Sequence, residues 1–353
     1  MSSLPLWLLT LIFLAAAVVV WIAGIQLSKT TDVLDDRLHL GSALGGLIVL
    51  AVATNLPEIA ITVSAAASGD VSVAVGNILG GIALQTVVLV ALDAFGRRGR
   101  GVRPLTYRAA SLVLVIEALV VVAILGVVVA GTQLPESVIA ARLTPPVVLI
   151  AVLWVVGLVL VQRAGKHLPW HDEGNAPGAS PHRPGPRGRK PQQPHQGWST
   201  RKAGLVFAVS ALATLGAGVV LERAGDAAAS QVGLGGVLFG ATVLALATSL
   251  PELSTGLESI KQGDDNLAMS DIFGGNAFLP VLFLAATLIS GQAVLPAAGG
   301  SNIYLTALAV LLTLVYAVGL IFRSPRRIAG MGIDSFLVLV LYALGVVGLF
   351  AIA

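Results

Sequence analysis

Long apolar stretches alternate with short polar segments along almost the whole chain. Each stretch holds roughly 20 or more mostly apolar residues, the length that a helix needs to cross the hydrocarbon core of a bilayer. The pattern predicts ten spans joined by loops, and we therefore expect an all-α membrane protein. The expected spans are 5–27, 40–66, 71–95, 109–131, 144–163, 203–222, 231–260, 265–290, 301–322 and 331–353.

Composition supports this class and excludes others. Of the 353 residues, 56% are hydrophobic and only 11% are charged, which is too apolar for a soluble core. The stretch 5–27 has no basic flank and no small-residue cleavage site, so we expect a retained span rather than a signal peptide. The chain has no cysteine, which excludes disulfides, thiol catalysis and cysteine metal sites.

Basic residues divide unevenly between the two sides of the predicted topology. Nineteen of the 21 lysines and arginines fall in alternate loops, and only Arg142 and Arg223 fall on the opposite side. The positive-inside rule then predicts a multi-pass protein of the inner or plasma membrane, with both termini outside the cytoplasm. The basic charge faces the lipid bilayer, and we expect no nucleic-acid partner.

The segment 164–202 interrupts the apolar pattern. It is rich in Pro, Gly, Arg, His and Gln, and it cannot bury enough apolar surface to fold alone. Its histidines suggest a metal sensor, but their irregular spacing favours a solvated tether. We predict a disordered cytoplasmic linker between two five-helix halves, 1–163 and 203–353. An odd number of spans per half makes the second half enter the membrane inverted.

Two segments, one in each half, have nearly the same sequence. LAVATNLPEIA at 50–60 matches LALATSLPELS at 244–254, at an offset of 194 residues. The match continues in register through a Gly-Asp pair and a Gly-Gly pair, which shared membrane composition would not produce. We infer an internal duplication, with a site between the two inverted repeats.

Each copy of this motif places a proline inside an apolar helix. Pro57 and Pro251 have no N–H, so the carbonyls one turn earlier, at Ala53 and Ala247, lose their helical donors. Such carbonyls are tolerated at membrane depth only where they line a cavity or bind something. We expect a kink at each proline.

A glutamate follows each proline. Glu58 and Glu252 come four residues after Thr54 and Thr248, on the same helical face. Ionisable residues inside a bilayer are costly and mark ion or proton pathways. Two facing copies would form an all-oxygen cage with a formal charge of −2, suited to a hard cation such as Ca²⁺. The following helices contain side chains that can supply further oxygens: Asn77, Gln85, Asp271 and Asn276.

At these residues the chain resembles the cation/calcium exchanger superfamily, specifically its sodium/calcium exchanger branch. The resemblance rests on the two Thr-x-Leu-Pro-Glu motifs and covers all ten spans. It implies Glu58 and Glu252 as central Ca²⁺ ligands and Thr54 and Thr248 as ligands through backbone and hydroxyl oxygens. It also implies Ala51 and Ala245 as carbonyl donors to flanking Na⁺, with Asn55 and Ser249 in the place of the signature serine.

The chain departs from the family pattern in the third and eighth spans. Gly81 and Gly275 stand where serines are usual, and Ile82 replaces an asparagine. Gln85 replaces the later asparagine and Leu279 the later aspartate. Several oxygens associated with Na⁺ are therefore absent.

Four further acids fall in or near the predicted spans. Asp93, Glu258 and Asp334 lie near span ends, and we expect them at the membrane interface. Glu117 lies within the fourth span, whose helix contains no basic residue. We expect it to be protonated or hydrogen-bonded, as an accessory proton site at most.

These features predict a secondary antiporter that exchanges Ca²⁺ or a similar divalent cation for Na⁺ or H⁺ by alternating access. It needs no cofactor beyond the transported cations and no obligate protein partner. Two alternatives stay open: a membrane cation sensor or structural protein that does not transport, and a membrane-embedded enzyme. The enzyme lacks support, because the spans contain no HExxH motif and no Ser/His pairing.

Overall fold

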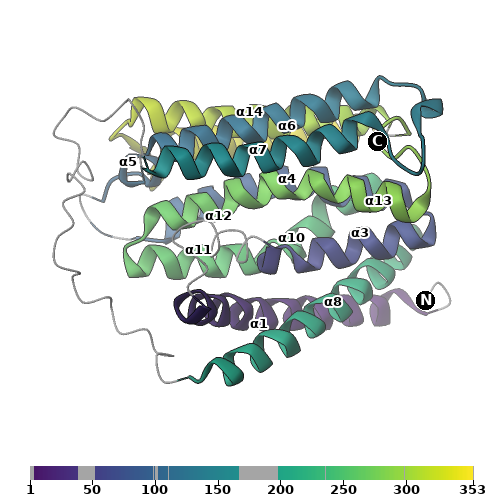
Figure 1. Ribbon diagram of the computed structural model, residues 1–353, viewed down its shortest axis with the longest axis horizontal. Helices are drawn as coiled ribbons and strands as arrows, with labels where there is room; N and C mark the ends of the chain where they lie inside the picture. The colour runs from purple at the N-terminus through teal and green to yellow at the C-terminus, as the bar shows by residue number, and fades with distance from the viewer. Residues whose placement is uncertain are drawn as a thin grey trace.

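Helices make up most of the protein and run roughly side by side (Figure 1). The structure is a computed structural model that describes residues 4–38, 52–97, 99, 102–109, 111–166, 198–234, 236–297 and 299–352. The helices of the first half are α1 (Leu6–Leu38), α3 (Leu56–Ser68), α4 (Val71–Phe95), α5 (Leu105–Arg108), α6 (Leu112–Thr132), η1 (Glu136–Val138) and α7 (Pro145–Lys166). Those that follow are α8 (Thr200–Gln231), α9 (Gly236–Phe239), η2 (Gly240–Leu244), α10 (Ala245–Thr248), α11 (Leu250–Gln262), α12 (Asp265–Phe278), η3 (Leu279–Val281), α13 (Leu282–Ser290), α14 (Gly300–Phe322) and α15 (Ile333–Ile352).

Eight helices of the described residues are long and apolar enough to cross a membrane, so the fold is that of a multi-pass membrane protein. The expected span 40–66 is described only from residue 52 onward. The expected span 231–260 is divided into several short helices and does not form one continuous rod. The count of ten spans therefore remains a prediction.

Several helices extend beyond the predicted apolar spans, although the candidate spans Leu6–Leu27 and Pro145–Gly165 agree with the predicted 5–27 and 144–163. The first helix continues to Leu38 rather than ending near residue 27, and α8 runs from Thr200 to Gln231 rather than over 203–222. α7 extends to Lys166, so the part of the expected linker that lies outside the described residues is 167–197. Hydropathy marks the apolar length of a helix, whereas the backbone hydrogen bonds continue into polar sequence beyond the apolar core.

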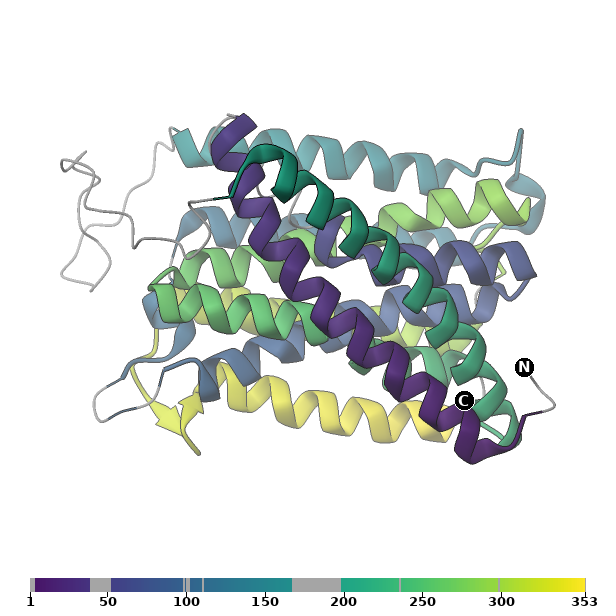
Figure 2. The ribbon, with the colours of Figure 1, turned by 90° about the horizontal axis from the view of Figure 1, so that it is seen from below.

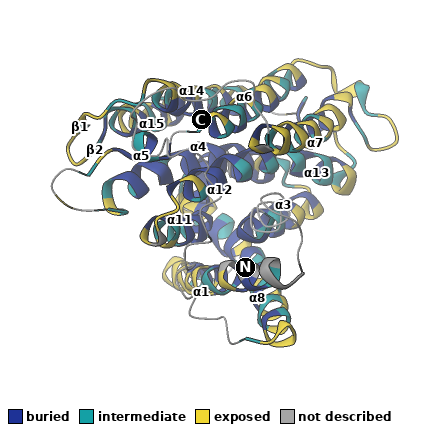
Figure 3. Ribbon diagram, turned by 60° about the vertical axis from the view of Figure 1, so that its left-hand side comes forward, coloured by how far each residue is buried: buried dark blue, intermediate teal, exposed yellow. Residues whose placement is uncertain are grey.

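The helices form layers with α4 and α12 in the middle (Figures 1 and 3). α4 is the most buried of the candidate spans, with 78% of its apolar stretch buried, against only 22% in α7, 28% in α8 and 22% in α15. α1 and α8 pack against each other and run obliquely across one face of the bundle (Figure 2). Any group on the inner face of α4 or α12 is thus shielded from solvent and lipid.

The α3–α4 and α11–α12 corners have the same construction. Gly69 and Gly263 end the first helix of each corner with φ of 81° and 92°, which a residue without Cβ adopts at little cost. Asp70 and Asp264 then cap the next helix by accepting a backbone N–H three residues on, at 3.2 and 2.9 Å. The positions differ by the 194-residue offset of the sequence repeat.

The loops rich in basic residues meet at one end of the bundle. The Asp93 carboxylate, at the end of α4, accepts the backbone N–H groups of Leu105 and Gly332 at 2.7 and 2.6 Å. Arg323 donates to the Tyr107 carbonyl at 3.1 Å. These bonds tie α5 to the short hairpin β1 (Arg327–Ile328) and β2 (Met331–Gly332). The start of α1 and the end of α15 lie at the opposite end (Figures 1 and 2).

Candidate cation site

Both Pro-Glu motifs lie where a helix begins. α3 starts at Leu56 after Asn55, and α11 starts at Leu250 after Ser249. In each, the proline occupies the first turn, where its missing N–H costs no helical hydrogen bond. The second segment is more broken, because the π-helix η2 precedes α10. A continuous helix with a kink was expected, whereas the helix here ends and restarts.

The break in each helix brings free backbone N–H and C=O groups close to the glutamates. Glu58 and Glu252 stand in the first turns of α3 and α11, where the helix dipole and free N–H groups favour negative charge. The segment before each break ends with carbonyl oxygens that favour a cation. Discontinuous helices of this kind surround cation sites in transporters.

The two glutamates are fully buried and close enough to repel each other. Glu58 is 0% exposed and Glu252 is 1% exposed. The charged groups that act on Glu252 in the described chain are Glu58 and Asp271, both acidic. Neither Glu58 oxygen accepts a well-formed hydrogen bond from a described residue, although Thr248 and Gln85 lie beside it. Such a pair needs a bound cation or protons, because an isolated buried carboxylate is very costly.

Gln85 of α4 connects the two motifs. Its Nε2 donates to Asn55 Oδ1 at 3.2 Å and, more weakly, to Glu252 Oε1 at 3.5 Å. Its own Oε1 is buried and has no partner among the described residues. The side chain thus offers one oxygen to a bound ion while its amide group holds the two helix starts together.

The remaining residues of the two breaks are buried beside the glutamates. Thr54, Asn55, Thr248 and Ser249 are all at most 3% exposed. The Ala245 carbonyl accepts hydrogen bonds from Thr248 Oγ1 at 3.2 Å and from the Ser249 N–H at 3.0 Å. Its equivalent, Ala51, lies outside the described residues.

Asp271 of α12 reaches the neighbourhood of Glu252 through a hydrogen bond with α11. Its Oδ2 accepts a hydrogen bond from Thr255 Oγ1 at 3.1 Å, and Thr255 lies one turn beyond Glu252 on α11. Helix rise along α12 separates Asp271 from Leu279 by about 12 Å, yet Asp271 faces the central pair. A third carboxylate therefore borders the site.

The two asparagines of the candidate set differ in their contacts. Asn276 Nδ2 donates to Thr86 Oγ1 at 3.1 Å, which leaves its Oδ1 without a partner among the described residues. Asn77 is fully buried, and neither polar atom of its side chain has a partner there. Both can offer an oxygen to a cation.

Glycines of the oblique helices contact the prolines of the motifs. A Cβ on Gly24 of α1 would lie 2.7 Å from Pro251 Cβ, and one on Gly218 of α8 would lie 3.1 Å from the Pro57 carbonyl oxygen. Gly24 and Gly218 differ by 194 positions, as do Pro57 and Pro251, so each glycine contacts the proline of the other half. Sequence reasoning missed the glycines, although extending the repeat comparison into the first helix would have paired them.

A second pair of contacts is related by the same offset, Gly81 with Leu279 and Gly275 with Gln85, and involves the positions that depart from the family pattern. A Cβ on Gly81 would lie 3.5 Å from Leu279 Cδ1, an apolar contact in place of ligands. A Cβ on Gly275 would lie 3.0 Å from Asn55 Nδ2 and 3.3 Å from Gln85 Oε1. The space above Gly275 is therefore filled by amide groups, whereas the space above Gly81 is filled by hydrocarbon.

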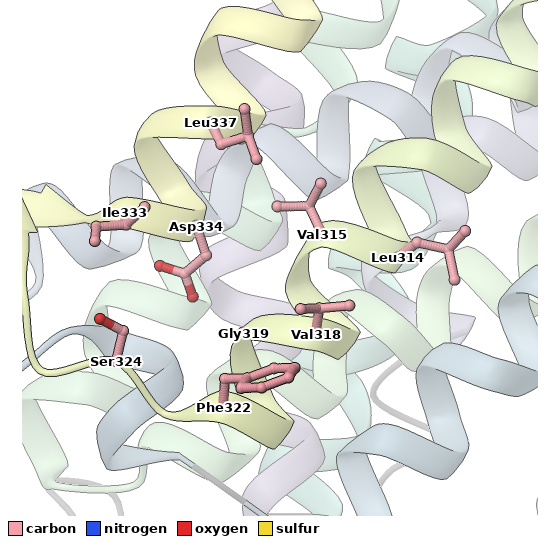
Figure 4. Close-up of a pocket in the computed structure, with 9 residues that line it drawn as sticks. All are labelled: Leu314, Val315, Val318, Gly319, Phe322, Ser324, Ile333, Asp334 and Leu337. Carbon is pink, nitrogen blue, oxygen red and sulfur yellow. The ribbon is translucent and has the colours of Figure 1, made fainter.

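A cavity of about 340 Å³ lies elsewhere, in a groove between α14 and α15 (Figure 4). Its walls are apolar except near Ser324 and Asp334, which sit at the end of the groove beside the α14–α15 loop. None of the residues that line it belongs to the candidate cation site. This groove faces outward and does not lead to the glutamates.

Comparisons with known proteins identify a family and similar folds. The family model described as sodium/calcium exchanger protein matches residues 7–162 and 202–351. A protein of Alkalimonas amylolytica named antiporter CaxA is 27% identical over 296 residues, which cover 83% of this chain and 85% of that protein. Inner membrane protein YrbG of Escherichia coli strain K12 is 23% identical over 295 residues, covering 82% and 81%.

Solved structures share the fold. The sodium-calcium exchanger NCX_Mj superposes with a TM-score of 0.63 at 16% identity, over 97% of this chain and 99% of that one. A structure described as the H⁺/Ca²⁺ exchanger CAX gives 0.60 at 14% identity, over 97% and 88%. The two scores are so close that the fold does not distinguish between them.

Close approach of α8 to the first motif can be tested with two glycines of the same helix. Gly218→Val should push α8 away from Pro57 and Ala60, because overpacking of this kind costs about 1–3 kcal/mol. We expect a lower midpoint of thermal unfolding in detergent and weaker Ca²⁺ binding by calorimetry.

Gly216→Val is the matched control, since a Cβ there meets no atom within 4 Å. Equal effects of the two substitutions would contradict the importance of this contact.

Proposed function

Because the chain belongs to the sodium/calcium exchanger protein family, we propose that it is a secondary antiporter that moves Ca²⁺ or a similar divalent cation in exchange for H⁺ or Na⁺. The family is one of transporters, and eight membrane-spanning helices of the described residues suit that role. The substrates are the transported ions themselves, without a cofactor.

The observation that carries the proposal is the pair of buried glutamates, whose charged neighbours among the described residues are all acidic. Two such carboxylates cannot remain ionised and empty in a medium of low dielectric constant. A divalent ion, monovalent cations or protons must therefore occupy the site before it changes access. This requirement makes the transport an obligatory exchange.

The proposed central ligands of the divalent ion are Glu58 and Glu252, with Thr54 and Thr248 completing the cage. Ca²⁺ takes about 6–8 oxygen ligands, so carboxylates and hydroxyls alone leave room for carbonyls or water. The proposed flanking oxygens are those of Ala51, Ala245, Asn55, Ser249, Asn77, Gln85, Asp271 and Asn276.

We propose protons as the coupling ion. Na⁺ needs a cage of oxygens to replace its hydration shell, and the contact between Gly81 and Leu279 supplies only carbon. Protons bind a carboxylate directly. The related folds include one protein named for Na⁺ and another named for H⁺, so Na⁺ is the alternative that the experiment must exclude.

We further propose ten spans in two inverted repeats, 1–163 and 203–353, joined by a cytoplasmic linker at 164–202. The span around α3 and the broken segment α9–α11 would add two spans to the eight long helices and bring the total to ten. Two observations support the repeat: the matching corners at Gly69 and Gly263, and the exchanged contacts of Gly24 and Gly218.

The proposed membrane is the inner or plasma membrane, with both termini outside the cytoplasm. The basic loops meet at one end of the bundle, opposite the described chain ends (Figure 1). This arrangement agrees with the unequal division of lysines and arginines.

A cation sensor that does not transport is the alternative function. It would bind Ca²⁺ at the same carboxylates but produce no flux across a sealed membrane. An enzyme has no support in a family of transporters.

Neutralising either glutamate should abolish exchange. Glu58→Gln and Glu252→Gln each remove one of two charges that balance the divalent ion. Changes to outer-shell residues already cost metal sites 10–100-fold, so we expect radiolabelled Ca²⁺ uptake by proteoliposomes to fall by more than about 100-fold. The exposed carboxylate variant Glu136→Gln is the control. Near-normal flux in either buried variant would exclude the shared site.

An imposed pH gradient should drive Ca²⁺ movement without Na⁺. When the interior of the proteoliposomes is acidic, the outward flow of protons should drive Ca²⁺ inward. Restoring oxygens with Gly81→Ser and Leu279→Asp should increase dependence on Na⁺, since a serine fits at Gly81 with ordinary contacts. Sodium-driven exchange by the unmodified protein that ignores an imposed pH gradient would refute proton coupling.

Orientation can be measured with single cysteines, because the native chain has none. Glu136 and Arg326 are both exposed and lie at opposite ends of the bundle. An impermeant thiol reagent added outside intact cells should modify Glu136→Cys and leave Arg326→Cys unmodified. The reverse pattern would invert the proposed topology.

A further inference from the structure

Glu117 is a buried carboxyl group of α6 that the proposed exchange does not use. It is 7% exposed and lies inside an apolar helix that packs against α7, α12 and α14. Its Oε1 accepts a hydrogen bond from Ser270 Oγ of α12 at 2.8 Å. Its Oε2 is buried and has no partner among the described residues.

The elements packed against α6 direct their own polar groups elsewhere. On α12, Asp265 pairs with Arg108 and Asp271 accepts from Thr255. On α14, Tyr316 donates to Ser335, and on α7 the charged residues are confined to the last turns. Within the described chain, Ser270 is the polar group that acts on Glu117.

A metal ion does not suit this position. Ca²⁺ and similar hard cations need several oxygens, whereas the described surroundings offer one carboxyl group and one hydroxyl already used as a donor. A bare carboxylate in such surroundings is also too costly. A proton requires no cage and removes the charge.

We infer that Glu117 is a second proton-binding site, separate from the Glu58–Glu252 pair and occupied at neutral pH. The Ser270 hydroxyl donates to one carboxyl oxygen, and the proton sits on the other. This arrangement keeps the contact between α6 and α12 neutral.

Its place in the chain links this proton to the cation site. Ser270 precedes Asp271, which reaches Thr255 of α11 beside Glu252. Successive residues of α12 thus bind Glu117 on one side and border the cation site on the other. Loss of the proton would put an uncompensated charge into the contact that positions Asp271. This positioning role rests on the proposed function, whereas proton binding itself does not.

The stability of the folded state depends on pH because the folded and unfolded states bind different numbers of protons. An unfolded glutamate releases its proton above about pH 4.3, whereas the folded protein retains it at Glu117. The folded state therefore binds one more proton, and its stability falls as pH rises through the neutral range. The folding equilibrium should lose about a factor of ten per pH unit from this residue alone.

Infrared difference spectroscopy tests the proton directly and requires no transport. At neutral pH and saturating Ca²⁺, subtracting Glu117→Gln from the wild type should reveal the C=O stretch of a protonated carboxyl group. Ser270→Ala should retain this band and move it to higher frequency, because the carbonyl no longer accepts a hydrogen bond. The midpoint of thermal unfolding should fall with rising pH more steeply in the wild type than in Glu117→Gln.

Glu258→Gln is the matched control, since the Glu258 side chain is 56% exposed and pairs with Lys261. Its difference spectrum should contain carboxylate bands only. Carboxylate bands in the Glu117→Gln difference, without a protonated band, would overturn the inference. If Glu117→Gln does not fold, Ser270→Ala remains as the test. A carboxyl band whose frequency is unchanged in Ser270→Ala would also overturn the inference. A protonated band in a protein that fails to transport would refute only the proposed function.

Discussion

Glu58 and Glu252 are buried together with no positively charged partner among the described residues, and the packing around them has to accommodate this charge. Glu58 and Glu252 are shielded from water, and the third charged group beside them, Asp271, is acidic as well. No described lysine or arginine neutralises this charge. The protein uses helix starts, whose dipoles favour anions, and leaves the remaining balance to an occupant.

Helix packing explains why the two motifs can meet. Gly24 and Gly218 have no side chain, so α1 and α8 approach the prolines of the opposite half closely. On the other side, Gln85 of α4 spans from Asn55 to Glu252. The site is therefore held between a pair of oblique helices and a central helix, and neither half could form it alone.

The departures from the family pattern have a consistent physical result. Leu279 covers Gly81 with hydrocarbon, and the amides of Asn55 and Gln85 fill the space above Gly275. Hydrocarbon and amide groups therefore occupy these positions, while Asp271 adds a carboxylate near Glu252. A site with fewer neutral oxygens and one more acid suits protons better than Na⁺, which is the basis of the proposed coupling.

Residue type and spacing alone identify the membrane class and the acids that prove to be buried, and they predict the inverted repeat. An apolar stretch of sufficient length becomes a span in any arrangement, and Pro-Glu inside it signals an interrupted helix. α1 and α8 continue beyond the spans that the sequence predicts, because hydropathy does not report where backbone hydrogen bonds stop. Three contacts arise only when the chain folds: Asp271 with Thr255, Gln85 with Asn55 and Glu252, and Glu117 with Ser270. These contacts join residues up to 167 positions apart, and they depend on how helices rotate and cross, which no local pattern encodes.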